Sequence, residues 1–368
     1  MRLVWGIVTS IEHASEDIQL LEVSLDDRTV GPAIAFPRLS GICGVAERVL
    51  VNATGSELDS AGGVRAIVVA RAGSTEGTAH EHVAQGRTLK LRHTPMQVDV
   101  ACVEERDNTH HATMRSAQTL AGMPVACCGL PGQVFAVAVA AKATARDARI
   151  AFVMSDEGAL TLAVSDAVRA ARATGLISTT VTCGQAIGGE LEALNVHSGL
   201  LAARHAANAD IAILAPGPGV PSTATPFGHI GVSQGNALNA VSSLGGVPVA
   251  VLRLLSAVQD DGAWGVHPQS LIALGRVALS RAVVPVPPLP DEFRDGVDAT
   301  LEDAGLWNRH VRVDVDSVPS SGQAAIRGQR GRAEDPASAL AASAAGVLCA
   351  RYASGEAAPD VRLPDDFS

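Results

Sequence analysis

From Pro124 onward, short runs of four to six residues that are apolar almost throughout alternate with stretches of helical pattern. The runs read VACC, RIAFVM, ISTTVT, DIAILA, VPVAVL and AVVPV. A strand that is buried on both faces has no polar side, as in a parallel sheet covered by helices. The sequence therefore predicts an α/β fold over residues 124–290, with a doubly wound, mostly parallel sheet of the Rossmann-like kind.

Helix signals lie between these apolar runs. One helix is predicted from Glu157 to about Ala173, with Ser155 or Asp156 as its cap and Gly175 just past its end. Apolar residues at helical spacing support this helix, and four other helices are predicted between or after the apolar runs. The other four are predicted from Gln133 to about Thr144, from Gly189 to about Ala207, from about Ser233 to Leu244, and from Pro268 onward.

The rest of the chain carries different patterns. Residues 1–100 hold short β-rich runs separated by Asp-Asp, Gly-Pro, Ser-Gly and Gly-Gly pairs, which predict a small β-barrel or sandwich-like domain. Residues 101–123 connect this domain to the α/β domain. Residues 291–355 hold an acidic helix, a strand and an Ala-rich helix that we expect to pack on the α/β domain, and residues 356–368 are expected to form a flexible tail.

The composition excludes several classes of protein. With 368 residues, of which 47% are apolar and 18% charged, the chain is long enough to bury two domains. Its longest apolar run, Val134 to Ala141, is far shorter than the roughly 20 residues of a membrane helix. The N-terminus, MRLVWGIVTSIEH, has no long apolar segment. We therefore expect a cytoplasmic protein that does not use a membrane as a partner.

Charge and cysteine usage agree with this expectation. A net charge of −10, with three tryptophans and one tyrosine, argues against nucleic acid as a partner. The basic cluster from Arg327 to Arg332 is either a solvated linker or a loop that holds an anionic ligand. The cysteines have no C-x-x-C spacing, which favours reduced thiols in the cytoplasm. They are Cys43, Cys102, Cys127, Cys128, Cys183 and Cys349.

Polar residues and glycines gather where the predicted strands end. In open α/β sheets, ligands bind outside the carboxyl ends of the strands, because loops and free N–H groups converge there. Each glycine at these positions either lets the main chain approach a ligand or serves only a tight turn. The residues that we expect to orient a ligand there are Ser155, Gly184, Gln185, Gly189, Gly217, Gly219, Ser233 and Gln234.

Known cofactor and metal fingerprints do not match the sequence. There is no G-x-x-x-x-G-K-[ST], and the GPGVPS stretch from Gly217 lacks the last glycine of G-x-G-x-x-G. No particular cofactor is therefore predicted. No metal site is predicted either, because the histidines of residues 80–111 lack a metal-binding spacing. These histidines are His80, His82, His93, His110 and His111.

The helix predicted from Gly189 places three small or polar residues on one face. At 100° per residue, Glu192, Asn195 and Gly199 fall on a single stripe. If this stripe points into the site, Glu192 supplies an acid or base and Asn195 contacts the ligand. Alternatively, Glu192 complements the helix dipole and nearby alanines allow close helix packing.

The stretch GHIGVSQGNALNA, residues 228–240, contains G-x-S-x-G, the nucleophile elbow of serine hydrolases. An elbow is a sharp turn directly between strand and helix, whereas seventeen residues separate Ser233 from Ala215 at the end of the nearest strand. Ser233 also suits a helix N-cap. The spacing therefore favours a cap over a nucleophile.

His267 is the best histidine candidate for a general acid or base. It lies in a loop with Asp260 and Asp261, beyond the carboxyl end of a predicted strand. Because it immediately precedes Pro268, the alternative is that it serves only the start of the next helix.

Several long stretches resemble one family. They read RVLVNATGSEL, LKLRHTPMQ, TCGQAIGGELEALNVHSGLLAARH, GHIGVSQGNALNAV and HPQSLIALGRVALSRAVVPVP. The chain resembles, over most of its length, a bacterial family known as domain of unknown function 3866. The resemblance implies no particular activity. It implies that a position like Ser233 often holds an acidic residue, and that Gln185, the helix with Glu192 and Asn195, and the His267 loop match better.

Together these patterns predict a cytoplasmic protein that binds a small polar or anionic metabolite at the carboxyl edge of its sheet. Hydrolase or transferase chemistry would draw its acid–base groups from Asp156, Glu192 and His267. The alternative is a non-catalytic ligand sensor or protein-interaction module. A homodimer is expected only because it is the commonest soluble oligomer.

Overall fold

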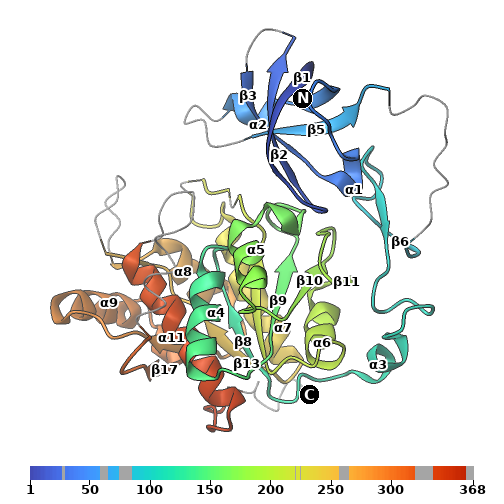
Figure 1. Cartoon of the computed structure of the whole chain (residues 1–368). Coiled ribbons are helices and arrows are strands. Elements are labelled where there is room, and N and C mark those ends of the chain that lie inside the picture. Colours follow the sequence, from blue (N-terminus) through green and yellow to red (C-terminus); the bar gives the residue numbers. More distant parts are fainter. Residues whose placement is uncertain are drawn as a thin grey trace. The chain divides into compact units, whose positions relative to one another are not determined.

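The computed structural model describes residues 1–26, 30–58, 65–73, 85–219, 221–223, 225–256, 265–319 and 335–361. The chain divides into two compact units (Figure 1). The first comprises residues 1–85 and 91–99, and the second comprises residues 86–90 and 100–368. Several residues named from the sequence lie outside the described ranges: His80, His82, Asp260, Asp261, the basic cluster 327–332 and residues 362–368 of the expected tail.

The first unit is a closed barrel with the strand order β1-β2-β3-β5-β4. Neighbouring strands are antiparallel except β3 and β5, which are parallel. Alternate side chains, such as those of Val8, Leu21 and Val49, fill its interior. The predicted N-terminal β-barrel is therefore confirmed. Its elements are β1 (Leu3–Ala14), β2 (Gln19–Leu25), β3 (Val30–Ala35), α1 (Pro37–Ser40), β4 (Arg48–Asn52), α2 (Thr54–Leu58) and β5 (Ala66–Arg71).

The second unit contains an eight-stranded sheet in which every pair of neighbouring strands is parallel. The strand order is β11-β10-β9-β12-β8-β13-β16-β17. It differs from the Rossmann order because β12 lies between β9 and β8. The strands are β8 (Pro124–Cys127), β9 (Ile150–Ser155), β10 (Thr179–Cys183), β11 (Leu191–Ala193), β12 (Ile211–Pro216), β13 (Val247–Ala250), β16 (Val283–Val286) and β17 (Val311–Asp314).

Helices cover both faces of this sheet (Figure 1). Successive strand residues point to opposite sides, so Phe152 joins one hydrophobic core and Val153 the other. The predicted doubly wound α/β fold is therefore confirmed. The core of Phe152 is covered by α4 (Gln133–Thr144), α5 (Asp166–Ala173) and α11 (Pro336–Ala353), and the core of Val153 by α6 (Val196–His205), α7 (Ser233–Ser243) and α9 (Asp291–Asp303).

The remaining elements are short. Among the described residues, no helix is both long and apolar enough to span a membrane. The short elements are β6 (Thr88–Lys90), β7 (Val98–Val100), α3 (His111–Ser116), β14 (Leu254–Leu255), β15 (Gly265–Val266), α8 (Pro268–Ile272), the 3-10 helices η1 (Leu162–Val164), η2 (Ile230–Val232) and η4 (Leu306–Asn308), and the π-helix η3 (Ala273–Val277).

The helix predicted from Glu157 begins only at Asp166, so this boundary was wrong. Its cap is Ser165, whose hydroxyl accepts the N–H of Val168. The residues after β9 instead pack against the loop after β12. A Cβ atom on Gly158 would lie 2.1 Å from the carbonyl oxygen of Gly217. This close contact between two loops overrides the local helical pattern.

The helix predicted from Gly189 was also wrong in its first part. Glu192 lies on strand β11, and the helix starts at Val196. Glu192 therefore does not share a helix face with Asn195 and Gly199. The strand forms because its residues pair with β10, where Glu192 stands beside Thr182.

Candidate functional site

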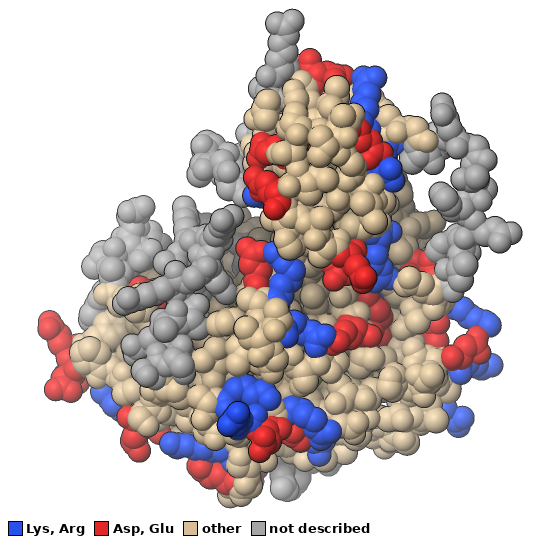
Figure 2. Space-filling view, in the orientation of Figure 1, with Lys and Arg blue, Asp and Glu red and all other residues tan. Residues whose placement is uncertain are grey.

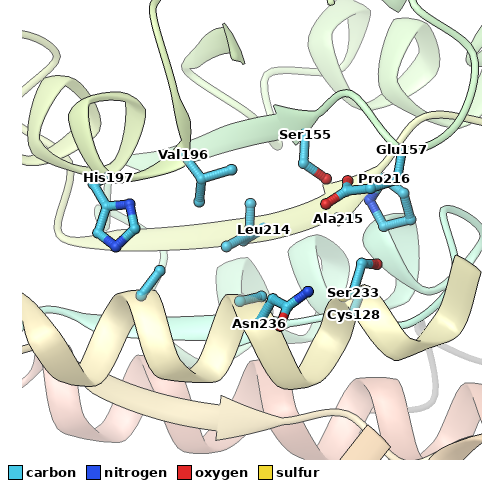
Figure 3. Close-up of a pocket in the computed structure, with 12 residues that line it drawn as sticks. Cys128, Ser155, Glu157, Val196, His197, Leu214, Ala215, Pro216, Ser233 and Asn236 are labelled. Atoms are coloured by element: carbon cyan, nitrogen blue, oxygen red, sulfur yellow. The ribbon is translucent and has the colours of Figure 1, made fainter. Parts of the chain in front are cut away.

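A pocket of about 210 Å³ lies at the carboxyl ends of β8, β9 and β12 (Figure 3). From β9 the chain continues to α5 on one face of the sheet, whereas from β12 it continues to α7 on the opposite face. Such a reversal marks the crevice where α/β proteins bind ligands. The lining residues are Cys128, Ser155, Glu157, Val196, His197, Leu214, Ala215, Pro216, Ser233, Asn236, Ala237 and Ala240.

The polar side chains of the pocket come from three elements. Ser155 and Glu157 follow β9, Ser233 and Asn236 belong to α7, and His197 belongs to α6. Figure 3 shows Ser155, Glu157 and Ser233 at one end of the pocket and His197 at the other. The wall between them is mainly apolar. A mostly apolar pocket with a few converging polar groups is typical of small-molecule sites.

Ser233 is the most informative of these residues. Its side chain lines the pocket, the residue is only 7% exposed, and its hydroxyl oxygen has no hydrogen-bond partner among the described residues. The predicted N-cap role was wrong, because the 3-10 helix η2 runs directly into α7 and supplies its first turn. The Ser233 N–H itself bonds to the carbonyl of Ile230. The hydroxyl is therefore free to meet a ligand.

The glycines around Ser233 have structural roles. A Cβ atom on Gly235 would lie 2.7 Å from the carbonyl oxygen of Ala273 in the π-helix η3. A Cβ atom on Gly231 would lie 3.0 Å from the His229 ring. Because η2 precedes Ser233 and no strand leads directly into it, the G-x-S-x-G sequence does not form an elbow here.

The first turn of α6 forms the far end of the pocket. Asn195 caps this helix, since its side-chain oxygen accepts the N–H of Ser198 at 3.0 Å. The Ser198 hydroxyl in turn accepts the Asn195 N–H, which completes a capping box. Asn195 was predicted to contact a ligand. It does not line the pocket, but it fixes the start of the helix whose first two residues do.

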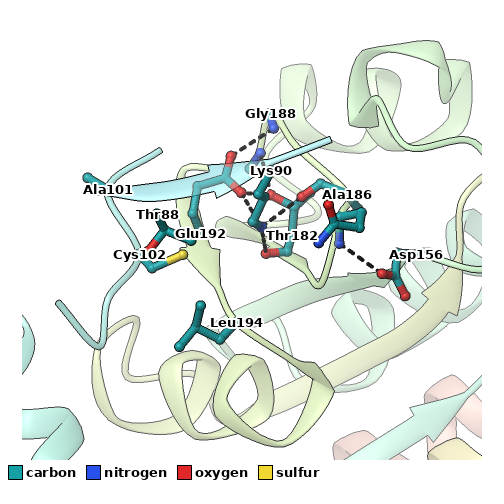
Figure 4. A network of polar contacts seen from close by, with 12 residues as sticks. Thr88, Lys90, Ala101, Cys102, Asp156, Thr182, Ala186, Gly188, Glu192 and Leu194 are labelled. Carbon is teal, nitrogen blue, oxygen red and sulfur yellow. Dashed lines mark hydrogen bonds and ion pairs between the residues drawn. The ribbon is translucent and has the colours of Figure 1, made fainter. Parts of the chain in front are cut away.

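Glu192 belongs to a buried ion pair away from the pocket lining (Figure 4). One carboxylate oxygen accepts the Lys90 ammonium at 2.8 Å and the Thr182 hydroxyl at 2.6 Å. The other accepts the N–H of Gly188 at 2.9 Å. Both carboxylate oxygens are thus occupied by the protein, as a structural ion pair requires.

The Lys90 ammonium group is also fully hydrogen-bonded within the protein. It is fully buried, and its ammonium donates to Glu192 and to the carbonyl oxygens of Thr182 and Ala186. These three bonds use all three of its donors. A lysine in the β-rich run LKLRHTPMQ was the available sequence signal. Its partner lies about a hundred positions further along the chain, so local patterns did not reveal the pair.

Asp156 and Gln185 tie two loops together. The Gln185 N–H donates to Asp156 Oδ2 at 2.8 Å (Figure 4). Gly184 has a φ of +61°, and a Cβ atom there would collide with the Asp156 carboxylate. Neither Asp156 nor Gln185 lines the pocket. The neighbouring Glu157, which the sequence analysis did not select, is the carboxylate that does.

Three further expected residues serve the fold. Gln234 is buried and donates to the carbonyl oxygens of Cys127 and Val251, which ties the ends of β8 and β13. Gly189 lies where a Cβ atom would meet Thr182 N at 2.7 Å. Gly219, with a φ of +76°, takes a left-handed turn after β12. These residues shape the sheet edge but do not line the pocket.

His267 lies outside the pocket as well. Its Nδ1 atom accepts the N–H of Gln269 at 3.1 Å, and the residue is the N-cap of α8. The structure thus places it in the helix-start role that the sequence left open. Sequence reasoning missed His197 and Asn236 as pocket residues, because only the packing of α6 beside α7 brings them together.

No cluster of metal ligands is found in the described part of the chain, and two buried thiols outside the pocket lining have raised pKa values. Over the described residues, no group of three His, Cys, Asp or Glu side chains is arranged to hold a metal ion. Burial raises the pKa of the Cys102 thiol to about 11 and also raises the pKa of Cys183. These two thiols therefore stay protonated at neutral pH.

The fold and the pocket define a two-unit α/β protein with a pocket at the carboxyl edge of an all-parallel sheet. The chain belongs to the family described as "Protein of unknown function (DUF3866)", which matches residues 32–346. The resemblance noted from the sequence is therefore confirmed, and the matched range contains every residue of the pocket. No curated protein matches the chain. A fold of this kind does not by itself define a function, which depends on the residues of the site.

Proposed function

We propose that the pocket beside β8, β9 and β12 binds a small polar organic molecule. The observation that carries this proposal is the Ser233 hydroxyl, which is buried, lines the pocket and has no partner in the described part of the chain. A buried hydroxyl without a partner costs roughly 1–3 kcal/mol. A hydrogen-bonding atom of a ligand in the pocket removes that cost.

The residues that line the pocket favour ligand binding over catalysis. A nucleophilic serine needs a base within hydrogen-bond reach. The Ser233 hydroxyl has no hydrogen-bond partner among the described residues, so Glu157 at the same end of the pocket is not within that reach, and His197 lies at the opposite end (Figure 3). The predicted acid–base groups Asp156, Glu192 and His267 lie outside the pocket and accept hydrogen bonds from the protein. These observations support a ligand-binding role, such as a sensor, more than a hydrolase or transferase.

A thermal-shift screen against amino acids, sugars, nucleotides and phosphorylated metabolites tests the proposal. A ligand present at about 100 times its dissociation constant adds about 2.7 kcal/mol to stability, which raises the melting temperature by several degrees. The shift should disappear in Ala240→Leu, because the larger side chain fills the pocket that Ala240 lines. Ala299→Leu, on the exposed face of α9, is the matched control and should keep the shift.

Two outcomes of this screen decide the matter. A hit that is lost in Ala240→Leu and kept in Ala299→Leu supports the pocket as the binding site. If every hit survives in Ala240→Leu, or if no compound in the panel shifts the wild type, the proposal fails.

The proposal includes a cytoplasmic, bacterial setting and a small molecule rather than nucleic acid as partner. The six cysteines are free thiols and all are buried, which fits a reducing compartment. Figure 2 shows acidic and basic side chains interspersed on the face in view, whereas nucleic-acid sites gather basic ones. A homodimer stays a prediction, which analytical ultracentrifugation tests.

A further inference from the structure

The two ends of the pocket differ in charge. Glu157 is the one acidic side chain among the described residues that line the pocket, and it lies with Ser155 and Ser233 at one end (Figure 3). In the same part of the chain, no Lys or Arg side chain lines the pocket to neutralise it. This end offers a carboxylate and two hydroxyl oxygens as acceptors, which suits an ammonium group of a ligand.

The other end is the start of α6, a helix of ten residues. The N–H groups of Ser198 and Gly199 bond to Asn195. The first two N–H groups of the helix, those of Val196 and His197, have no acceptor within the helix. Both residues line the pocket. A helix start of this kind favours a carboxylate or another anion.

A helix start alone does not define a site, but a second observation points to the same pocket. Ser233 is more than nine-tenths buried, its hydroxyl has no hydrogen-bond partner in the described ranges, and it lies on the pocket wall. Glu104 lies near the start of α6, since one of its carboxylate oxygens accepts the N–H of Leu194, but it does not line the pocket. Glu104 therefore does not occupy the place that we assign to the ligand.

The wall between the two ends is apolar. Leu214, Ala237 and Ala240 contribute to it, and each presents only hydrocarbon to the pocket. Such a wall suits a short chain of methylene groups. The volume of about 210 Å³ limits the ligand to a small metabolite.

We infer that the pocket takes a small zwitterion, with its ammonium group at Glu157 and Ser233, its carboxylate at the first turn of α6, and a short apolar spacer between them. This inference rests on the proposed function, since it names the class of ligand for the same pocket. It follows from the separation of the acidic end from the helix start, and not from the Ser233 hydroxyl alone.

Calorimetric titrations with matched probes test the inference. The probes are the zwitterions glycine, 4-aminobutanoate and 6-aminohexanoate, which differ in spacer length, with butylamine and butanoate as analogues that carry one charge each. At least one zwitterion should bind about tenfold more tightly than both single-charge analogues, because it uses both ends of the pocket.

Two variants that change a charge test which end of the pocket binds the ammonium group and which binds the carboxylate. Glu157→Gln should weaken the binding of the best zwitterion and of butylamine by about tenfold and leave the affinity for butanoate unchanged. His197→Glu should weaken the binding of the zwitterion and of butanoate by a similar factor, because it places a negative charge at the start of α6. Asp303→Asn, at the end of α9 and outside the pocket lining, is the control and should leave all three unchanged.

The outcomes separate this inference from the proposed function. If butylamine binds as tightly as every zwitterion and His197→Glu has no effect, the inference is wrong while the pocket still binds a ligand. The same conclusion holds if no zwitterion binds but another compound of the thermal-shift panel binds and is lost in Ala240→Leu. If nothing binds in the pocket, both the inference and the proposed function fail.

Discussion

Ser233 presents a buried polar atom that the described part of the protein does not satisfy. We expect Ser233→Ala to leave the free energy of unfolding unchanged or to raise it by up to about 1 kcal/mol, because the substitution removes an unpaired hydroxyl. A helix N-cap would instead lose about 1 kcal/mol on this change. Chemical denaturation distinguishes the two. Ser116→Ala, at an exposed helical serine, serves as the control.

Lys90 and Glu192 show the opposite case, in which the protein satisfies every polar atom of a buried pair. Lys90→Met should destabilise the protein by about 3–5 kcal/mol, because it leaves the Glu192 carboxylate buried without a counter-charge. Adding Glu192→Gln to Lys90→Met should recover part of the loss. Denaturation midpoints of the single and double variants measure this coupling, and strictly additive losses would contradict it.

The burial of His310 predicts how the stability of the protein depends on pH. Its Nδ1 accepts the N–H of Ala282 at 3.2 Å, its Nε2 lies 2.9 Å from the carbonyl oxygen of Leu274, and burial lowers its pKa below the ordinary 6.5. The unfolded chain therefore binds a proton near pH 6.5 that the folded chain does not. Stability from this residue is present above about pH 6.5 and is lost as the pH falls below it.

The measurement for His310 is the slope of stability against pH. Between about pH 7 and pH 5, the free energy of unfolding should fall further for wild type than for His310→Gln. At pH 7 the variant should be the less stable of the two. Equal slopes for the two proteins would rule out a neutral, buried His310.

At the scale of elements, local pattern predicted some boundaries and failed at others. Helix α4 occupies Gln133–Thr144 as predicted, and α7 starts at the predicted Ser233. Helix α4 is apolar over nearly its whole length, whereas the apolar residues of α7 recur at helical spacing, and both signals are local. The helix starts predicted at Glu157 and Gly189 were wrong, because contacts with residues far away in the sequence determine the secondary structure of those segments. Gly217 crowds the loop after β9, and β10 pairs with the segment around Glu192.

The contact between α7 and η3 yields a prediction about Gly235. In a solvent-exposed helix, replacing glycine by alanine usually stabilises by about 1 kcal/mol. Gly235→Ala should instead destabilise by about 1–3 kcal/mol, since the new Cβ atom would lie 2.7 Å from backbone atoms of Ala273 and Ala278. Gly275→Ala is the control, because its Cβ atom would meet only Leu306 at 3.7 Å. Thermal unfolding of both variants checks the sign.

At the scale of the whole molecule, strand order decides which predicted residues meet. Sequence alone placed a site at the carboxyl edge of the sheet, and the pocket lies there. It did not give the order of strands, in which β12 lies between β9 and β8. That order brings Ser155 and Ser233 to one pocket. Gln185 follows β10, one strand further out, and His267 follows β15 in the separate two-stranded sheet β14-β15, so neither lines the pocket.

The central claim is that the pocket beside β8, β9 and β12 is the ligand site, and a crystal structure with the tightest compound of the thermal-shift panel tests it most directly. We expect electron density for the compound between α6 and α7, with one of its polar atoms within hydrogen-bond distance of the Ser233 hydroxyl. Density for the compound elsewhere on the protein, with this pocket empty, would contradict the claim.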